Sequence, residues 1–566
     1  MNVPQPCRHH RPQTRQRLHA DPGLGFGNFL AKVLDEDVDR HGWLFELERA
    51  WVSPSGNTFW YLSLAEIQAS VEDLAGWYLA FGVRPREVVL TYTSEGISQF
   101  LHGVALMAIG AIPAPVNWRM PPHITLLYHQ RYGFDHLVVD QHGHVDRILE
   151  LMRSEQYRSI SLLDARPGQP GKGSGLASRD ARRHYGAGDE LVMLCHSSGT
   201  TDVPKAVMFG HQQFFHGKRD RLIGFLEREQ ERMLSTLPHS HSAGFSYLMT
   251  AVLLGLPTRV LSDLTGPDLP RHLLEFQPTV VAGFSQTYAA LAESLGDGGL
   301  ECLHRAYNTG DTAHASHVES LLRAAPNLRF HDGFGASELG MALFCAVSSK
   351  MQHGRKRRNV GQPVPFAQAR IVDERGNILP PGSIGYLAMR SPTITAGYYR
   401  DPLLTNRCRT ESGDWLTGDI GFLNEAGEFV HLDRAVDVME TPHGPAYTLA
   451  LEEAVLSDGG IHDVTITGVP LTPRMSQAVV AYIQIPPESA SAACDHVLGV
   501  LETELTRSLG CPAPVAVVNL TPQAHAPTGA TGKALKRVLR DEFWPALQAW
   551  NERRDGPFTH AVRRHF

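Results

Sequence analysis

Residues 195–205, which read Cys-His-Ser-Ser-Gly-Thr-Thr-Asp-Val-Pro-Lys, decide the fold of this 566-residue chain. The apolar run at 191–194 directly before them predicts a buried strand. A loop that follows a strand and is dense in N–H and O–H donors is suited to holding phosphate oxygens. Its spacing is not that of a Walker A loop. An ordinary Ser/Thr-rich turn is the alternative, but the joint presence of hydroxyls, Gly, Pro and Lys favours a phosphate site.

The sequence around this loop alternates between helical and strand patterns. The alternation over residues 26–165 and again over 192–338 predicts an α/β fold with layered sheets. A β-rich stretch follows at 360–432, and residues 434–566 are long enough for a small α+β domain of their own.

Composition narrows the function classes. The net charge of −7 and the ordinary charged fraction give no general field for nucleic acid. The seven cysteines are scattered without metal-type spacing, which is typical of reduced thiols in a cytoplasmic enzyme. Residues 1–25 lack an apolar core and predict a disordered tail rather than a signal peptide. The longest apolar run, 103–116, is too short for a membrane span.

The loop at 195–205 resembles the phosphate-binding motif [ST]-[SG]-G-T-T-G-x-P-K-G of the adenylate-forming superfamily. This superfamily includes acyl-CoA synthetases, adenylation domains of nonribosomal peptide synthetases, and luciferases. The chain departs from the motif at Asp202 and Ala206, where glycine is usual. The resemblance covers residues 26–543. It implies a large N-terminal domain (26–433) of two doubly wound subdomains plus a distorted β-barrel, and a small mobile α+β C-terminal domain (434–566).

Further motifs stand in the same order as in the family. Residues 238–244 match P-x-x-H-x-x-G, and the resemblance places His241 where the acyl tunnel meets the active centre. A satisfied core histidine is the alternative for a lone His of this kind. Residues 331–338 match Y-G-x-T-E, with Phe for Tyr and Ser for Thr. There Phe334 can stack on adenine and Asp332 can accept a hydrogen bond from its amino group. Glu338 and Thr201 are the expected Mg²⁺ ligands.

The C-terminal motifs complete the expected nucleotide site. Residues 414–419 resemble W-x-x-T-G-D, so Asp419 is expected to bind the ribose hydroxyls. Arg434 stands at the family's hinge arginine, although Asp433 and Val436 depart from the usual residues around it. Residues 527–533 resemble P-x-T-x-x-G-K, which makes Lys533 the expected catalytic lysine. The resemblance implies that the nucleotide is held by the following residues: Ser197, Ser198, Gly199, Thr200, Thr201, Lys205, Asp332, Gly333, Phe334, Ser337, Asp419, Arg434 and Lys533.

These motifs together imply adenylation of a carboxylic acid with ATP and Mg²⁺. An ionised carboxylate needs no general base; it attacks the α-phosphorus in line and expels pyrophosphate. Lys533, Thr201, Glu338 and the phosphate loop stabilise the charge that develops on phosphoryl oxygens. In the family the small domain then rotates and admits a thiol.

The substrate pocket and the acceptor loop depart from the family. Asp311 stands where Gly or Ala is common on the pocket wall, facing either a polar substrate group or a protein partner. The expected pocket residues are His241, Phe284, Gly310, Asp311 and Gly335; together with Phe334 they favour a small aromatic or polar-substituted acid. The loop at 439–447 stands where the family has K-x-x-G-x-x-[IV]. Its glycine, Gly444, comes one position later than in the family, two prolines are present, and the lysine is missing.

Three hypotheses follow. The leading one is an acid–thiol ligase with CoA as acceptor. The second is an adenylate-forming enzyme with another acceptor: a carrier protein, an amine, or nitrite-dependent diazotisation of an aromatic amine. The third is a lapsed homologue that binds a nucleotide or an acyl ligand. The sequence leaves the acid, the acceptor and the oligomeric state open.

Overall fold

The computed structural model describes residues 4–140, 142–166, 188–197, 203–262, 268–285, 287–288, 291, 299–310, 312–348, 359–457, 461, 463–470, 477–483, 487–510, 515–519 and 535–541. The chain divides into two compact units. Unit 1 comprises residues 1–310, 321–342 and 391–408, and unit 2 comprises 311–320, 343–390 and 409–566. The predicted domain boundary at 433/434 stays a prediction.

A parallel sheet forms the first layer of unit 1, in the order β4 (Ile112–Pro115), β3 (Val88–Tyr92), β5 (His136–Val139) and β6 (Ser161–Asp164). Every residue of β3 is buried, as expected for a parallel strand covered on both faces. The helices that alternate with these strands are α3 (Leu64–Ala80), α4 (Ile97–Ala108), α5 (Pro122–Tyr132) and α6 (His142–Leu151), with a 3₁₀ turn at Glu155–Tyr157. A capping box of Ser63 and Glu66 fixes the start of α3.

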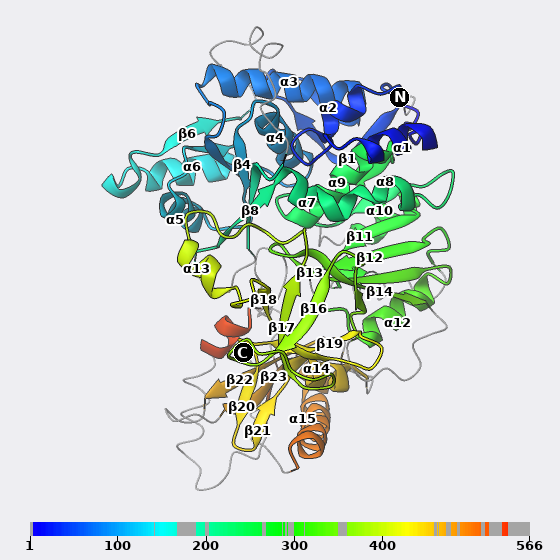
Figure 1. Ribbon diagram of the computed structural model, residues 1–566, viewed down its shortest axis with the longest axis vertical. Coiled ribbons are helices and arrows are strands. Elements are labelled where there is room, and N and C mark those ends of the chain that lie inside the picture. Colours follow the sequence, from blue (N-terminus) through cyan, green and yellow to red (C-terminus); the bar gives the residue numbers. More distant parts are fainter. Residues whose placement is uncertain are drawn as a thin grey trace. The chain divides into compact units, whose positions relative to one another are not determined.

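A second, larger sheet of unit 1 contains, in spatial order, β13 (Arg329–Ala336), β12 (Arg305–Thr309), β11 (Val280–Gly283), β9 (Met233–Ser235), β10 (Thr258–Val260), β1 (Trp43–Val52) and β2 (Thr58–Ser63). Pairing is parallel from β13 to β1, and β2 pairs antiparallel with β1. In Figure 1, β11, β12 and β13 of this sheet are green and β1 is blue. The carboxyl ends of parallel strands meet at one edge of a sheet, where α/β proteins place their ligands.

The remaining elements of unit 1 carry the phosphate loop and cover the sheets. The antiparallel hairpin β7 (Leu191–His196) and β8 (Ala206–Gly210) flanks the loop. Helix α9 (Ser242–Leu254) is buried on nearly all sides, as its mostly apolar sequence dictates. The helices are α2 (Phe29–Leu34), α7 (His211–Arg219), α8 (Arg221–Gly224), α9 (Ser242–Leu254), α10 (Leu269–Phe276) and α13 (Pro402–Arg407); α12 (Ala315–Ala324) is divided between the two units.

The N-terminal segment differs from the sequence prediction. Residues 4–25 were expected to be a disordered tail, and that expectation is wrong. They contain helix α1 (Pro12–Ala20), which begins at a proline, and Leu18 is buried. Trp43 Nε1 donates a hydrogen bond to the Pro4 carbonyl (2.8 Å), and His10 Nε2 lies 3.0 Å from the Val252 carbonyl. A few buried side chains and hydrogen bonds thus hold in place a segment whose average composition is polar.

Unit 2 holds the β-rich stretch and the C-terminal residues. The antiparallel sheet β16 (Gln368–Val372), β17 (Gly385–Arg390), β18 (Trp415–Leu423) and β19 (Phe429–Arg434) is open over the described strands, where a distorted barrel was expected. Strand β14 (Gly340–Ser348), which begins in unit 1, pairs with β15 (Gln362–Pro363) through residues of unit 2. A second core packs α14 (Thr448–Ser457) and α15 (Pro487–Leu509) against the sheet β22 (Val464–Pro470), β23 (Gln477–Ile483) and β24 (Val515–Asn519), beside the hairpin β20 (Met439–Thr441) and β21 (Gly444–Ala446).

Candidate active site

The two ends of the phosphate loop are tied to each other. The Ser197 N–H donates to the Lys205 carbonyl (2.9 Å), and the Lys205 N–H donates to Ser197 Oγ (3.1 Å). These bonds extend the β7–β8 ladder, in which His196 pairs with Ala206. The hairpin therefore holds the two ends of the loop together. Ser198, Gly199, Thr200, Thr201 and Asp202 lie outside the described residues.

Tyr398 joins the expected Mg²⁺ ligand to the phosphate-loop lysine. Its hydroxyl donates a hydrogen bond to Glu338 Oε1 (2.8 Å), and Lys205 Nζ lies 5.2 Å from the centroid of its ring. Burial and the neighbouring Glu338 carboxylate hold the Tyr398 pKa far above its usual value, so the phenol stays a donor. The Thr395 N–H also donates to the Glu338 carbonyl (2.8 Å). The sequence prediction missed Tyr398.

A signal for Tyr398 exists in the glycine before it. Gly397 has φ of 144°, and a Cβ at this position would collide with the side chain of Thr405. Only glycine can occupy this position. It fixes the path of the backbone and thereby the direction of the tyrosine that follows.

The expected adenine wall lies on neighbouring parallel strands. Asn308 of β12 is opposite Asp332 of β13 in the register, and its Nδ2 donates to Asp332 Oδ1 (2.7 Å). Phe334, two residues along β13, is buried. Gly333 and Gly335 flank Phe334 on this strand. The structure therefore brings the aromatic and the carboxylate of this motif together, with Asp332 already accepting one hydrogen bond.

Ser337 lies beside the phosphate-loop strand. Its Oγ is 3.8 Å from the sulfur of Cys195. Burial raises the pKa of the Cys195 thiol to about 11, so it stays protonated at neutral pH. This supports the interpretation of Cys195 as a packed thiol rather than a nucleophile.

Two expected substrate-pocket residues are in contact. Gly310 has φ of 81°, and a Cβ there would lie 2.8 Å from the ring of Phe284. Glycine is required at this position both by the backbone conformation and by the close ring. Phe284 is 6% exposed. Asp311, the residue that departs most from the family, lies outside the described residues.

Three histidines lie near the end of the phosphate-loop strand: His196 and His239 are buried, and His241 is half-buried. The rings of His196 and His241 are 6.4 Å apart between centroids. His241 precedes α9, and its N–H donates to the Pro238 carbonyl (3.0 Å). His239 is fully buried and pairs with Glu95 (Nδ1 to Oε1, 3.2 Å). Glu95 and His239 were not among the expected site residues: the 238–244 motif points to His241 rather than His239, and Glu95 belongs to none of the motifs.

The expected ribose residues pair within unit 2. Asp419 of β18 is opposite Arg434 of β19, and Arg434 Nη1 donates to Asp419 Oδ1 (3.1 Å). His431 Nε2 lies 3.2 Å from the same oxygen. Although burial acts to raise it, the pKa of Asp419 is lowered to about 2 by Arg434 and His431. The carboxylate is therefore ionised at every physiological pH.

The residue before Arg434 is held by the helix that follows. Asp433 is buried and accepts hydrogen bonds from both the N–H and the hydroxyl of Thr448 at the start of α14. Burial raises the pKa of Asp433 to about 7, against the opposing effect of Lys536. Val436 is 67% exposed. Lys533 lies outside the described residues, so its catalytic role stays a prediction.

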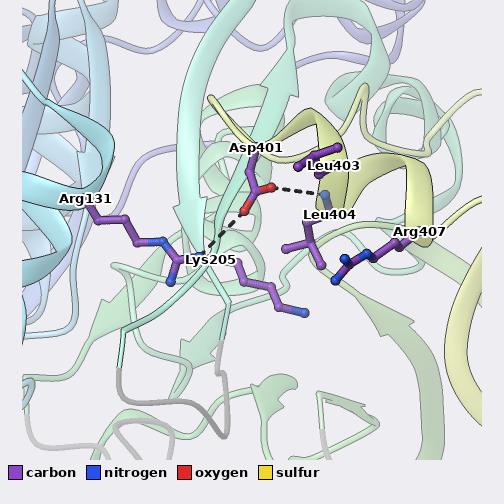
Figure 2. Close-up of a pocket in the computed structure, with 6 residues that line it drawn as sticks. All are labelled: Arg131, Lys205, Asp401, Leu403, Leu404 and Arg407. Atoms are coloured by element: carbon purple, nitrogen blue, oxygen red, sulfur yellow. Dashed lines mark hydrogen bonds and ion pairs between the residues drawn. The ribbon is translucent and has the colours of Figure 1, made fainter.

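A cationic pocket of about 370 Å³ opens beside Lys205, and Figure 2 shows its lining. Asp401 is its acidic residue; it pairs with Arg131 (3.6 Å) and accepts a hydrogen bond from the Leu404 N–H (3.0 Å). The pocket is lined by Arg131, Lys205, Asp401, Leu403, Leu404 and Arg407. The excess of positive charge suits an anion that approaches the phosphate-loop lysine.

A comparison with family models matches residues 50–399 to the AMP-binding enzyme family. The chain belongs to this family. A 3-aminoavenalumate diazotase from a Streptomyces species is 34% identical over 94% of this chain and 98% of its own. A 3-hydroxybenzoate–CoA ligase from Aromatoleum is 26% identical over 85% of this chain and 91% of its own. The ATP-bound MatB structure from Rhodopseudomonas palustris superposes with a TM-score of 0.75 at 21% identity, over 92% of this chain and 99% of that one.

These matches confirm the adenylate-forming family and the α/β fold with a large N-terminal and a C-terminal domain. The chain is an AMP-binding, ligase-type enzyme. In the part of the chain that the structure describes, no helix is both long and apolar enough to span a membrane. The described side chains also contain no group of three or more potential metal ligands.

Proposed function

We propose that this enzyme is an ATP- and Mg²⁺-dependent diazotase, which adenylates nitrite and transfers the nitrosyl group to the amino group of an aromatic acid. The observation that carries the proposal is the 34% identity to a diazotase across 94% of the chain, against 26% across 85% for the CoA ligase. The altered 439–447 loop supports it, since that loop departs where relatives line the path of a thiol.

The reaction balances without an external oxidant or reductant, because nitrite supplies nitrogen at the higher oxidation state. A nitrite oxygen attacks the α-phosphorus of ATP and pyrophosphate leaves. The amine nitrogen then attacks the nitrosyl nitrogen, and the bond from that nitrogen to the AMP oxygen breaks. One amine proton goes to a base and the second moves to the nitroso oxygen. This oxygen leaves as hydroxide, which takes up the proton held by the base, so that diazonium, AMP, pyrophosphate and water result.

The residues of the site fit the first half of this reaction. Lys205 and the phosphate loop supply positive charge and donors to the phosphates. Glu338 offers Mg²⁺ a hard carboxylate oxygen, and its other oxygen is fixed by Tyr398. Mg²⁺ would neutralise charge on the phosphates. Asp419 would bind the ribose, and Lys533 would stabilise the negative charge that develops at the α-phosphate.

An acid–CoA ligase is the second candidate, favoured by the similarity to 3-hydroxybenzoate–CoA ligase over 85% of the chain. A carrier-protein or amine acceptor would share its first half-reaction. In each of these cases the carboxylate of the acid is adenylated and nitrite is not needed.

One assay separates the candidates. The enzyme is incubated at neutral pH with Mg-ATP and 3-aminoavenalumate, 3-aminocinnamate or 3-aminobenzoate, with and without nitrite or CoA. AMP is quantified, and diazonium is trapped as an azo dye with 2-naphthol. Diazonium formation that needs ATP, nitrite and Lys533 is expected. AMP release that ignores nitrite but rises with CoA would instead establish the ligase, and Lys533→Ala is the control for both.

A further inference from the structure

A buried acid–base cluster lies where three strands of unit 1 end. Glu95 follows β3, His196 is the last residue of β7, and His239 follows β9. His196 directly precedes Ser197, so the cluster begins where the phosphate loop begins. His241, two residues after His239, belongs to the P-x-x-H-x-x-G motif and faces His196. The cluster therefore adjoins two motifs of the site already described.

The hydrogen bonds of Glu95 and His239 define the protonation of the imidazole. Glu95 Oε1 accepts from the Gly96 N–H (3.1 Å), the His239 N–H (2.6 Å) and His239 Nδ1 (3.2 Å). The bond from Nδ1 to a carboxylate places a proton on Nδ1 and leaves Nε2 as the basic nitrogen of the neutral ring. Glu95 thereby orients His239 and stabilises the imidazolium that forms when Nε2 takes up a proton, as a carboxylate does in a catalytic triad.

The outer atoms of this pair have no partner. Glu95 Oε2 and His239 Nε2 are both buried and lack a hydrogen bond among the described residues, as does Ser240 Oγ beside them. The side chains of His239 and Glu95 are 0% and 2% exposed. Leaving such an atom without a partner destabilises the fold, because the atom has lost its water and gained nothing in exchange. Such atoms call for a ligand or a transferred proton to explain them.

His196, by contrast, is satisfied. Its Nδ1 lies 3.2 Å from the Ser197 carbonyl, and its Nε2 accepts from the Asn117 N–H (3.4 Å). Burial lowers the pKa of His196, while the Ser197 carbonyl and the charge of Glu95 oppose this effect. Both ring nitrogens of His196 are therefore used, whereas in the dyad His239 Nε2 and Glu95 Oε2 have no hydrogen bond among the described residues.

We infer that the Glu95–His239 dyad is the proton acceptor and donor of the amine-transfer step, acting through His239 Nε2. The inference rests on the proposed function. Neither nitrite nor a carboxylate has a proton to lose when it is adenylated, so a buried base has a use only in the step in which the acceptor attacks. Diazotisation requires one. Nε2 accepts the proton that the amine loses on attacking the nitrosyl nitrogen, and returns it to the oxygen that leaves as water.

The test compares His239→Gln and Glu95→Gln with His102→Gln. His102 is a matched control, because it is a buried histidine of the same unit whose hydrogen bond is to Tyr78 (2.6 Å). Two rates are measured: nitrite-dependent exchange of pyrophosphate into ATP, which reports adenylation, and azo-dye formation, which reports amine transfer. We expect both dyad variants to keep exchange within about threefold of wild type and to lose diazonium formation by about 100-fold, in line with loss of an acid–base residue.

The pH profile adds a readout that a purely structural role would not move. The wild-type rate of diazonium formation should rise with pH as the base loses its proton, and His239→Gln should flatten that limb. Equal loss of exchange and of diazonium formation in both dyad variants, with His102→Gln unaffected, would overturn the inference. So would full activity of both variants. A wild-type enzyme that forms no diazonium would instead refute the proposed function, and the role of the dyad with it.

Discussion

Two buried carboxylates of this enzyme each lie beside a histidine but differ in their other partners. Asp419 of unit 2 is held by Arg434 and His431, and its pKa is lowered to about 2. Glu95 of unit 1 faces one imidazole, and its second oxygen has no hydrogen bond among the described residues. The first arrangement fixes a permanent negative charge, suited to binding hydroxyls. The second leaves capacity for a proton, suited to acid–base chemistry.

Among the substitutions that test this difference, we expect the largest effect on activity at Asp419. Asp419→Asn removes the fixed charge and leaves Arg434 without its carboxylate partner. Charge-assisted hydrogen bonds contribute about 1.5–3 kcal/mol each, so we expect kcat/KM for ATP to fall by about 100-fold. Initial rates over a range of ATP concentrations measure this. Asp373→Asn, at an exposed turn of unit 2, is the control. An unchanged KM and kcat for ATP would remove Asp419 from the nucleotide site.

The two carboxylates should also differ in their contribution to stability. The folded pKa of Asp419 lies below its unfolded value near 3.8, so its stabilisation is present above pH 4 and is lost as pH falls toward 2. The shift corresponds to about 2 kcal/mol. Urea denaturation at pH 7 and pH 3 should show that Asp419→Asn destabilises more at pH 7. Glu95→Gln should destabilise less than Asp419→Asn at pH 7, because the amide oxygen can keep the bonds of Oε1; the reverse order would contradict the contrast.

Glu338 is a third kind of carboxylate, because a neutral hydroxyl, that of Tyr398, holds it instead of a cation. Tyr398→Phe removes the hydroxyl but keeps the ring beside Lys205. We expect the Mg²⁺ concentration for half-maximal activity to rise about tenfold, the equivalent of about 1.4 kcal/mol. Tyr399→Phe is the neighbouring control. If Tyr398→Leu and Tyr398→Phe are equally impaired, the hydroxyl is the important group; a normal Mg²⁺ response in Tyr398→Phe would exclude this role.

The smallest effect concerns His314, where two carboxylates surround one imidazole. His314 Nδ1 lies 3.0 Å from Glu453 Oε2, and Nε2 lies 3.9 Å from Glu452 Oε2. Although burial opposes it, these carboxylates raise the His314 pKa above 6.5. The stabilisation is therefore full below pH 6.5 and is lost as pH rises through the folded pKa. His314→Gln should lower the melting temperature more at pH 6 than at pH 9. The difference between the two pH values should correspond to about 1 kcal/mol in the free energy of unfolding. The exposed His41→Gln is the control, and a pH-independent effect would indicate lost packing alone.

Much of the fold and some of the site could be predicted from local patterns. The apolar run before the phosphate loop is the buried strand β7, and the residues of the 331–338 motif lie together at the end of β13. Gly310 and Phe284, which were both expected in the substrate pocket, are neighbours in the fold, and their role there stays a prediction. The prediction for residues 4–25 was wrong because composition averages over a few anchors, such as Leu18, that decide whether a polar segment is folded. Tyr398 was missed although Gly397 precedes it, and Glu95 and His239 were missed because their pairing joins segments that lie far apart in the sequence.

The sequence by itself determined the adenylate-forming family, because each motif is a short run whose spacing alone carries its chemistry. Only the tertiary structure decided which distant side chains meet. Glu95 and His239 are separated by 144 residues, and Tyr398 and Glu338 by 60. Their contacts depend on which strands end at the same edge of a sheet and on the paths of the connecting loops. Hydrogen bonds act only over about 3 Å, so their partners follow from the packed fold rather than from any single stretch of sequence.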